Sequence, residues 1–318
     1  MRPTDWLLLL FLSVLWGATF SFAAIGLRDL PPLTLVLARV AIAALVLVVI
    51  CHASGYRLPR RLAGWQPFVV LAVLNNVVPF SLIFVGQTRI SSGLASVLNA
   101  TTPLFTLLIA RAFLGEPLQG PKLAGIGLGI AGVAILMGPD LVTLNRSSLL
   151  GTGCVLGGAL SYAFAALWMR RLRHIPPLLV AAAQVTCSTI MLLPVAALVD
   201  RFWTLPTPGT PTIVAVMGLA VFGTALAYIV FFRISASAGP SNVMLVTLLI
   251  PVTATALATL VLREQIASHQ AVGALAIAAG LLVIDGRGPA RLQRQRLEMR
   301  DRQGGSAATQ TAKRETVS

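Results

Sequence analysis

The chain has 318 residues, of which 57% are apolar and only 11% are charged, whereas about a quarter of a soluble domain is charged. The mean hydropathy is +0.87. This composition excludes a soluble enzyme, a disordered chain and a disulfide scaffold, and it predicts an integral membrane protein. The net charge is +14. The Arg and Lys residues that produce it lie between the apolar runs and in residues 287–318, so we expect no nucleic-acid partner.

Ten apolar runs follow one another along the chain, and each predicts one helix, because backbone groups in lipid must be hydrogen-bonded within their own segment. The expected fold is therefore all-α and integral to the membrane, with ten transmembrane helices. The runs are Trp6–Ile25, Leu33–His52, Trp65–Val85, Gly93–Phe113, Leu123–Met137, Leu149–Met169, Leu178–Val199, Thr212–Phe232, Ser241–Leu262 and Ala271–Ile284.

The basic residues predict the orientation. If the N-terminus is inside, ten basic residues fall on the inner side and five on the outer side, before the basic tail is counted. This bias predicts a multi-pass protein of the cell (inner) membrane with both termini cytoplasmic. The inner set is Arg2, Arg57, Arg60, Arg61, Arg111, Lys122, Arg170, Arg171, Arg173 and Arg233, and the outer set is Arg28, Arg89, Arg146, Arg201 and Arg263.

The chain also repeats itself at an offset of 148 residues. The matched pairs are Pro103 with Pro251, Glu116 with Glu264, Gly125 with Gly273, Gly132 with Gly280, and Gly138 with Gly286. We expect two five-helix repeats, at 5–138 and 149–286, and a basic cytoplasmic tail at 287–318 that is disordered. Because five is odd, the second repeat enters the membrane from the opposite side. Inverted repeats of this kind are typical of secondary transporters.

These residues resemble the EamA branch of the drug/metabolite transporter superfamily. The likeness rests on residues 15–20 (LWGATF), on Ala38-Arg39, and on the Pro and Glu spacing that recurs in both halves. The sequence departs from the family at Tyr162, where a Trp is usual, and at Arg263, where a Gly precedes the Glu in the first half. The resemblance implies ten helices, alternating access, and transport of small metabolites, amino acids or drugs.

Paired prolines and one buried cation are the first candidates for the transport machinery. Pro103 and Pro251 are expected to interrupt the fourth and ninth helices at matching positions, as hinges near a midplane site, or else as packing kinks. Arg39 is the only charge well inside an apolar run, about 9 Å from the outer end of its helix. It is either an anion contact or gate, or a structural side chain that snorkels or forms an ion pair.

Polar and aromatic residues at depth define a candidate substrate cavity. Amides and hydroxyls in lipid are costly unless they are paired or wet, so they either line a cavity or join helices by hydrogen bonds. Two of the aromatic residues occupy matching places in the two halves and are suited to stacking on a ligand, or else to core packing. The candidates are Trp16, Asn75, Asn76, Asn99, Tyr162, Tyr228, Asn242 and Thr247.

No metal-ligand cluster, phosphate loop or catalytic triad occurs in the sequence, so we expect neither a metal nor a cofactor. Asp and Glu are absent from the middle of every run, which argues against proton antiport. The glycines of the fifth and tenth runs predict a closely packed scaffold, and a homodimer contact is a further role for it. The expected partners are a small-molecule substrate and the lipid bilayer.

The predicted function is secondary transport of a small amphipathic metabolite, by export or facilitated diffusion. Multidrug efflux is the alternative within transport. A membrane-embedded sensor or enzyme is the alternative from another class. It is disfavoured because an enzyme needs converging titratable groups in the membrane and a sensor needs a larger soluble domain.

Overall fold

The computed structural model describes the chain apart from residues 1, 116–119, 144, 239–245 and 286–318. The described part is helical and contains no strand. Its helices group into ten segments, as the apolar runs predict, so the expected all-α fold is confirmed. Seven of these segments are long and apolar enough to cross a membrane. Asn242 and the basic tail lie outside the described residues.

The first five segments build the N-terminal half. They are α1 (Pro3–Gly26), α2 (Pro32–Ala53), η1–α3–η2–α4 (Leu62–Trp65, Gln66–Ala72, Val73–Val77 and Val78–Gln87), α5–α6 (Ser92–Asn99 and Thr102–Leu114), and α7 (Gly120–Thr143). The other five are α8 (Arg146–Met169) with η3 (Arg170–Leu172), α9 (Pro177–Val199), α10–η5–α11 (Thr210–Met217, Gly218–Leu226 and Ala227–Ala238), α13–η6 (Val246–Leu257 and Ala258–Leu262), and α14 (Ser268–Asp285). A short turn, η4 (Phe202–Thr204), joins α9 to α10.

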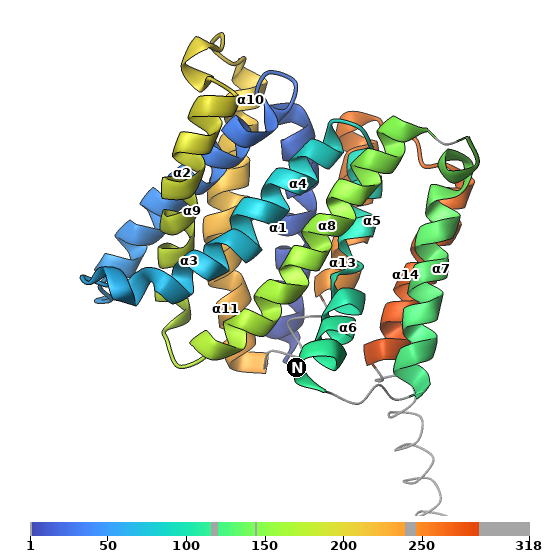
Figure 1. Ribbon diagram of the computed structural model, residues 1–318, viewed down its shortest axis with the longest axis horizontal. Helices are drawn as coiled ribbons and strands as arrows, with labels where there is room; N and C mark the ends of the chain where they lie inside the picture. Colours follow the sequence, from blue (N-terminus) through green and yellow to red (C-terminus); the bar gives the residue numbers. More distant parts are fainter. Residues whose placement is uncertain (1, 116–119, 144, 239–245, 286–318) are drawn as a thin grey trace, which may run out of the picture.

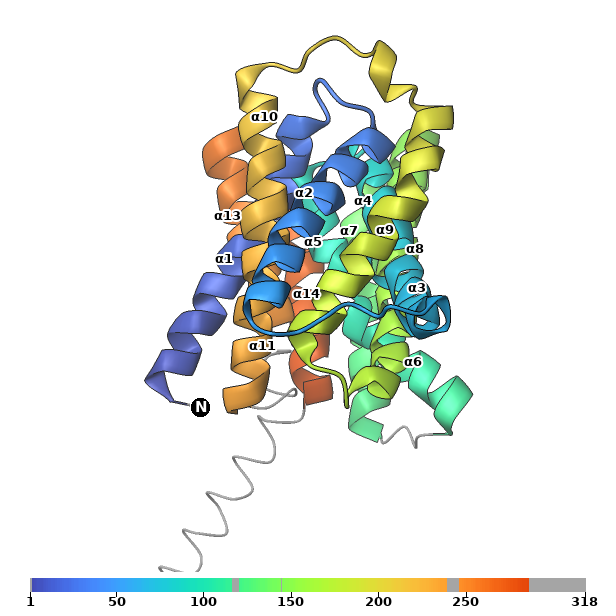
Figure 2. The same ribbon diagram turned by 90° about the vertical axis from the view of Figure 1, so that its left-hand side faces the viewer.

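The two halves interleave. Helix α2 of the first half packs against α9 and η5 of the second, and α1 packs against α13. Figure 2 shows α2 between α9 and the α10–α11 segment. The beginning of α1 and the end of α14 lie at the same face of the bundle (Figures 1 and 2). The ends of the described chain therefore share one side, as ten crossings require.

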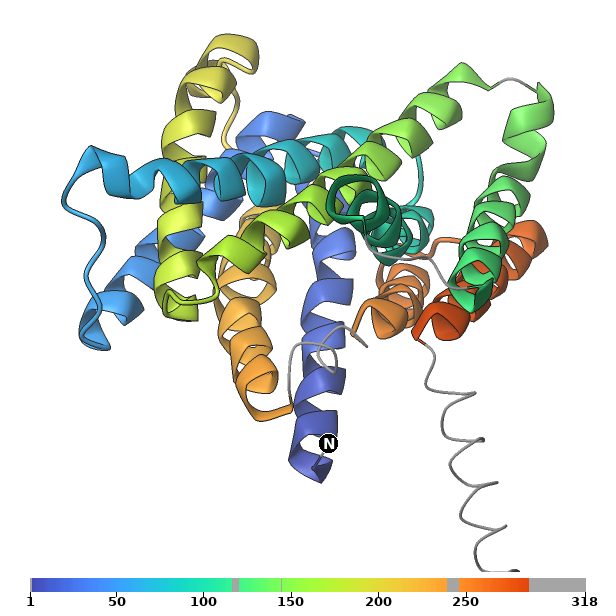
Figure 3. The same ribbon diagram turned by 60° about the horizontal axis from the view of Figure 1, so that its bottom comes forward.

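Helices α7 and α14 form a pair at one edge of the bundle, and two views show them side by side (Figures 1 and 3). Their glycines allow the backbones to approach closely. A Cβ atom at Gly132 would lie 2.8 Å from the carbonyl oxygen of Gly273. This close approach is the scaffold that the spacing of glycines in the fifth and tenth runs predicts.

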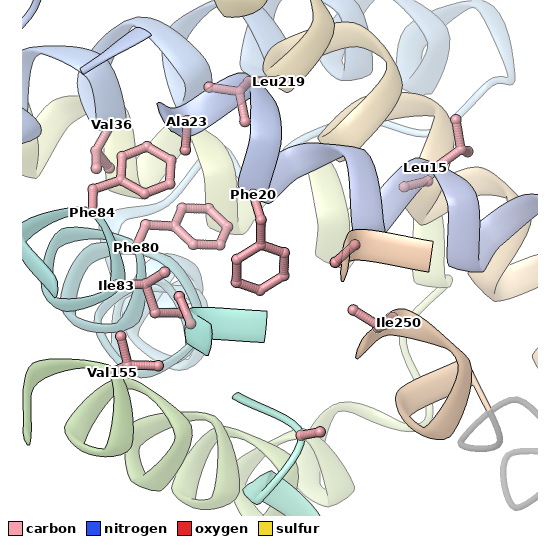
Figure 4. Close-up of a cluster of buried hydrophobic side chains, with 14 of the residues drawn as sticks. Leu15, Phe20, Ala23, Val36, Phe80, Ile83, Phe84, Val155, Leu219 and Ile250 are labelled. Carbon is pink, nitrogen blue, oxygen red and sulfur yellow. The ribbon is translucent and has the colours of Figure 1, made fainter. Parts of the chain in front are cut away.

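The interior of the bundle is apolar. Its largest buried cluster joins α1, α2 and α4 with η5 and α13, and Figure 4 shows the rings of Phe20, Phe80 and Phe84 gathered between α1 and α4. Large apolar side chains also face outward, among them Leu45, which is 70% exposed, and Leu198, which is 79% exposed. An apolar outer surface over long helices is the pattern that a lipid environment requires.

The two prolines of the repeat behave differently. Pro103 lies at the start of α6, directly after a break in the fourth segment at residues 100 and 101. Pro251 lies inside α13, which continues through it, and the next irregularity is the π-helical turn η6. The prediction of matching interruptions is therefore wrong for the second half. A proline removes only one helical hydrogen bond, and at Pro251 the surrounding packing maintains the helix.

Candidate functional site

The third and eighth segments each widen into π-helical turns near their middle. In the third segment the turn is η2, and in the eighth it is η5; an offset of 148 places η2 within η5. The turn η2 lies just before Pro79. Because proline has no N–H group, residue 79 cannot donate the usual hydrogen bond to the turn of helix before it. The amide of Val78 bonds to the carbonyl of Val73 instead, and the freed carbonyl of Leu74 accepts a hydrogen bond from Ser161 Oγ at 2.7 Å. Such turns often mark functional sites.

The π-helical turn η2 presents two predicted site residues to the opposite half. Asn75 Nδ2 donates to Gln184 Oε1 at 3.0 Å and to the hydroxyl of Tyr228 at 3.3 Å. Asn76 Nδ2 donates to Ser188 Oγ at 3.0 Å, and the Tyr228 hydroxyl donates to Asn76 Oδ1 at 3.1 Å. Asn76 is fully buried and Gln184 is 1% exposed. The structure thus joins Asn75, Asn76 and Tyr228 in one polar network across three segments, with Asn76 at its buried end.

Arg39 lies on α2 and is 6% exposed. Its Nε donates to Thr224 Oγ1 at 2.9 Å, and its Nη2 reaches the carbonyl of Gly223 at 3.5 Å. The guanidinium carbon stands 3.8 Å from the centre of the Phe80 ring and 5.8 Å from that of Phe84. No carboxylate of the described residues forms an ion pair with it. The interpretation of Arg39 as one half of an ion pair therefore finds no partner in this part of the chain.

The contacts of Arg39 and Gln184 are related by the internal repeat. Arg39 is the eighth residue of α2, and Gln184 is the eighth residue of α9, the corresponding helix of the second half. Each reaches across to a π-helical turn of the other half, Arg39 to Thr224 in η5 and Gln184 to Asn75 in η2. The two halves are thus joined twice at related positions, by Arg39 as a charged donor in one contact and by Gln184 as a neutral acceptor in the other.

Three other predicted residues lie on α1, α8 and α5. Trp16 is half-buried, with its ring centre 5.6 Å from that of Phe231. Tyr162 meets the edge of Phe80 at a centre-to-centre distance of 6.4 Å. Asn99 ends α5, and its buried Oδ1 has no hydrogen-bond donor among the described residues. Both aromatic residues therefore pack into the core.

A separate cavity of about 390 Å³ lies between α5, α13 and α14, and two predicted residues, Thr247 and Pro251, line it. Its walls are mostly apolar, and Glu264 lies at one end. The Glu264 carboxylate accepts hydrogen bonds from the backbone amides of Ser92 at 2.9 Å and Gly93 at 3.1 Å. Of the candidate residues predicted from the sequence, Asn75, Asn76 and Tyr228 therefore lie in the polar network and Thr247 and Pro251 lie at this cavity.

Some residues that contact Arg39 or the polar network could not be predicted from the sequence. Thr224 is a single hydroxyl in an apolar run, and Ser188 is one of three neighbouring hydroxyls with Thr186 and Thr189, so neither is singled out by a motif. The sequence could have identified Gln184, because this residue is the repeat counterpart of Arg39 and is polar within an apolar run. Groups of three or more metal-ligating side chains are absent from the part of the chain that the structure describes.

Ten helical segments, an apolar outer surface and buried polar contacts between two related halves define a multi-pass membrane transporter. The chain belongs to the EamA-like transporter family, whose model matches it twice, over residues 4–138 and 149–285. It is 28% identical to the uncharacterized transporter YvbV of Bacillus subtilis over 87% of this chain and 88% of that protein. It is 27% identical to a probable amino-acid metabolite efflux pump of Escherichia coli, over 89% of this chain and 95% of that one.

A third relative agrees with this assignment, and a solved structure has a similar fold. The uncharacterized inner membrane transporter YedA of Escherichia coli is 27% identical over 78% of this chain and 79% of its own length. One crystal structure covers 89% of this chain and 98% of its own chain with a TM-score of 0.62 at 19% sequence identity. At that identity, the likeness to the crystal structure shows the fold alone.

Proposed function

We propose that the protein is a secondary transporter, without enzymatic activity, that moves a small amphipathic metabolite such as an amino acid across the cell membrane by alternating access. The observation that carries this proposal is the pair of contacts that matching positions of α2 and α9 make with the opposite half, Arg39 with Thr224 and Gln184 with Asn75. Two inverted halves that meet through contacts at matching positions can exchange their arrangements, and a site between them then opens to each side in turn.

The direction and the membrane are part of the proposal. The charge bias of the loops favours the cell (inner) membrane with both termini cytoplasmic. The relative named as a probable amino-acid metabolite efflux pump supports export, and it supports amino acids or similar compounds as cargo. Export or facilitated diffusion then serves to release a metabolite that accumulates in the cytoplasm.

Multidrug efflux is the second candidate, and one observation favours it. The cavity between α5, α13 and α14 has apolar walls, and among the described residues its one charged lining residue is the acidic Glu264. A hydrophobic cation fits these walls and this charge, whereas an amino acid does not need so apolar a surface. The two candidates therefore predict different cargoes at different places in the same bundle.

The test is transport by the full-length protein in proteoliposomes. A panel of radiolabelled amino acids and a panel of fluorescent cationic dyes are offered to vesicles with and without the protein. We expect saturable, protein-dependent uptake of at least one amino acid and none of the dyes. Movement of the dyes alone would establish multidrug efflux instead. A correctly folded protein that moves no member of either panel would refute the proposed function.

A further inference from the structure

Arg39 is a buried cation whose hydrogen-bonding capacity the protein uses only in part. A guanidinium has five N–H donors. Nε donates to Thr224, and Nη2 has one long contact, with Gly223. Nη1 has no acceptor among the described residues. Because the side chain is 6% exposed, its charge lies in mostly apolar surroundings, where a cation is costly unless an anion balances it.

The second repeat provides an internal comparison. At the position equivalent to Arg39 stands Gln184, which carries no charge and still reaches the other half, where its Oε1 accepts a hydrogen bond from Asn75. A neutral side chain at this position of the helix can therefore form a hydrogen bond with the π-helical turn of the other half. The charge of Arg39 is not needed for that junction, and it calls for a different explanation.

The surroundings of Arg39 hold it in place while leaving donors free. Contact with the face of Phe80 at 3.8 Å attracts the cation without using any N–H group. The Thr224 hydroxyl accepts from Arg39 Nε while it donates to the carbonyl of Leu219 at 2.9 Å. This hydroxyl is neutral, so an anionic oxygen is a stronger acceptor for the same guanidinium.

We propose that Arg39 binds the carboxylate of the transported molecule, and that the cargo is a small amphipathic carboxylic acid, amino acids included. This inference rests on the proposed function, because it assigns a substrate class to the same site. The planar guanidinium matches a carboxylate with two parallel hydrogen bonds. Phe80 and Tyr162, whose rings meet at 6.4 Å, supply apolar surface beside the cation for the rest of the molecule (Phe80 is drawn in Figure 4).

The first experiment measures binding without transport. The full-length protein in detergent is heated in the presence of phenylacetate or of its neutral isostere phenylacetamide, with sodium chloride matching the ionic strength. We expect phenylacetate to raise the melting temperature in a saturable way and phenylacetamide to have a much smaller effect. If both probes act equally, or if neither acts, Arg39 is not a carboxylate site and the inference is overturned.

Two variants locate the effect. Arg39→Gln copies the residue of the second repeat, so the charge is lost while an amide N–H donor remains for Thr224. We expect phenylacetate binding to fall by at least about tenfold, as for the loss of a hydrogen bond to a charged group. Arg39→Lys keeps the charge and should fall less. Gln184→Leu is the matched control, and it should leave the preference for phenylacetate over phenylacetamide unchanged. Equal preference in wild type and Arg39→Gln would also overturn the inference.

The second experiment separates this inference from the proposed function. Proteoliposomes are offered each amino acid together with its amide, which lacks the carboxylate. If the transported amino acid is favoured over its amide in wild type and the ratio approaches one in Arg39→Gln, both proposals stand. If phenylacetate binds through Arg39 but nothing is transported, the anion site stands and the proposed function falls. If amino acids are transported and Arg39→Gln keeps the preference, the function stands and the anion site falls.

Discussion

Gly280 of α14 lies against the backbone of Gly125 on α7, so that a Cβ atom at Gly280 would be 2.6 Å from the Gly125 carbonyl oxygen. Residues 280 and 125 are the repeat counterparts of Gly132 and Gly273, which meet in the same way. The α7–α14 contact therefore follows the two-fold symmetry that relates the two repeats. Without a side chain at these points, the two backbones approach more closely than any other residue allows.

Replacing Gly280 by alanine should separate α7 from α14. Because the obstructing atoms belong to the backbone, they cannot move aside cheaply, and we expect a loss of about 1–3 kcal/mol of stability. Gly127→Ala on α7 is the matched control, since a Cβ atom there meets nothing within 4 Å. It should be neutral or gain up to about 1 kcal/mol from helix propensity. Thermal unfolding in detergent measures both, and an equal effect would contradict the packing.

The sequence predicts this contact because glycine spacing reports directly on backbone approach. It also predicts ten segments, since apolar length determines which stretches can cross lipid. It does not predict the π-helical turns, because the wider turn before Pro79 depends on a donor from another helix, Ser161, to satisfy the freed carbonyl of Leu74. For the same reason the sequence identifies Asn75 and Asn76 as candidates but not their partners, Gln184 and Ser188.

The buried amide network should contribute to the stability of the bundle. In Asn76→Leu the donor to Ser188 and the acceptor for Tyr228 are both lost, and we expect a cost of about 0.6–2 kcal/mol, as for hydrogen bonds between membrane helices. Thr189→Val is the control, because Thr189 bonds only to the carbonyl of Val185 in its own helix. Melting temperatures in detergent should fall for the first variant and stay near wild type for the second.

Asp29, in the connection between α1 and α2, ties that connection to α10. Its Oδ2 accepts hydrogen bonds from Thr212 Oγ1 at 2.6 Å and from the amide of Gly209 at 2.9 Å. These bonds, that of Thr212 first, hold the pKa of the Asp29 carboxyl below its ordinary value of 3.8. A lowered pKa in the folded state means that the contribution to stability is complete above the unfolded pKa and is lost as the pH falls through the folded one.

We therefore expect wild type to be more stable than Asp29→Asn at neutral pH, and the difference to begin to shrink only below about pH 4 and to be lost as the pH falls through the lowered folded pKa. Because Asp29 is exposed, solvent screens this contribution, and the effect should be a small shift of the melting temperature. The measurement is thermal unfolding of both proteins from about pH 6 to about pH 3. A difference that is undiminished at the acidic end would mean that the charge is not its cause.

The topology predicted from the loop charges is open to a direct test. The beginning of α1 and the end of α14 share one face of the bundle (Figure 1), and the charge bias assigns that face to the cytoplasm. A reporter active only in the cytoplasm should be active when fused after Ser318 and inactive when inserted at Arg146, at the start of α8 on the opposite face. The same activity at both positions would contradict an odd number of crossings in each repeat.

The last prediction concerns energy coupling. A proton-driven exporter needs a group that titrates during the cycle and is reached from both sides, and in membranes this is usually a carboxylate or an imidazole at depth. The carboxylates whose surroundings the structure describes all lie near helix ends and accept hydrogen bonds. Asp5 accepts from the Arg2 amide and from Ser237, Asp200 accepts from Thr34, and Glu264 accepts from the amides that begin α5. Protonation would break these bonds without neutralising a group in the middle of the bundle.

An imposed pH gradient should therefore not drive accumulation of a zwitterionic substrate above its own equilibrium, since the guanidinium of Arg39 is not deprotonated in proteins and so cannot carry a proton through the cycle. Substrate-loaded and empty proteoliposomes are compared with and without a pH step, and a protonophore is added as the control. Uptake should reach the same plateau in every case. An overshoot that the protonophore abolishes would contradict facilitated diffusion, and Asp5→Asn and Glu264→Gln would then be compared to find the group that carries the proton. Of the two, Glu264 is the stronger candidate for that role, because it lines the cavity and bonds to the opposite repeat.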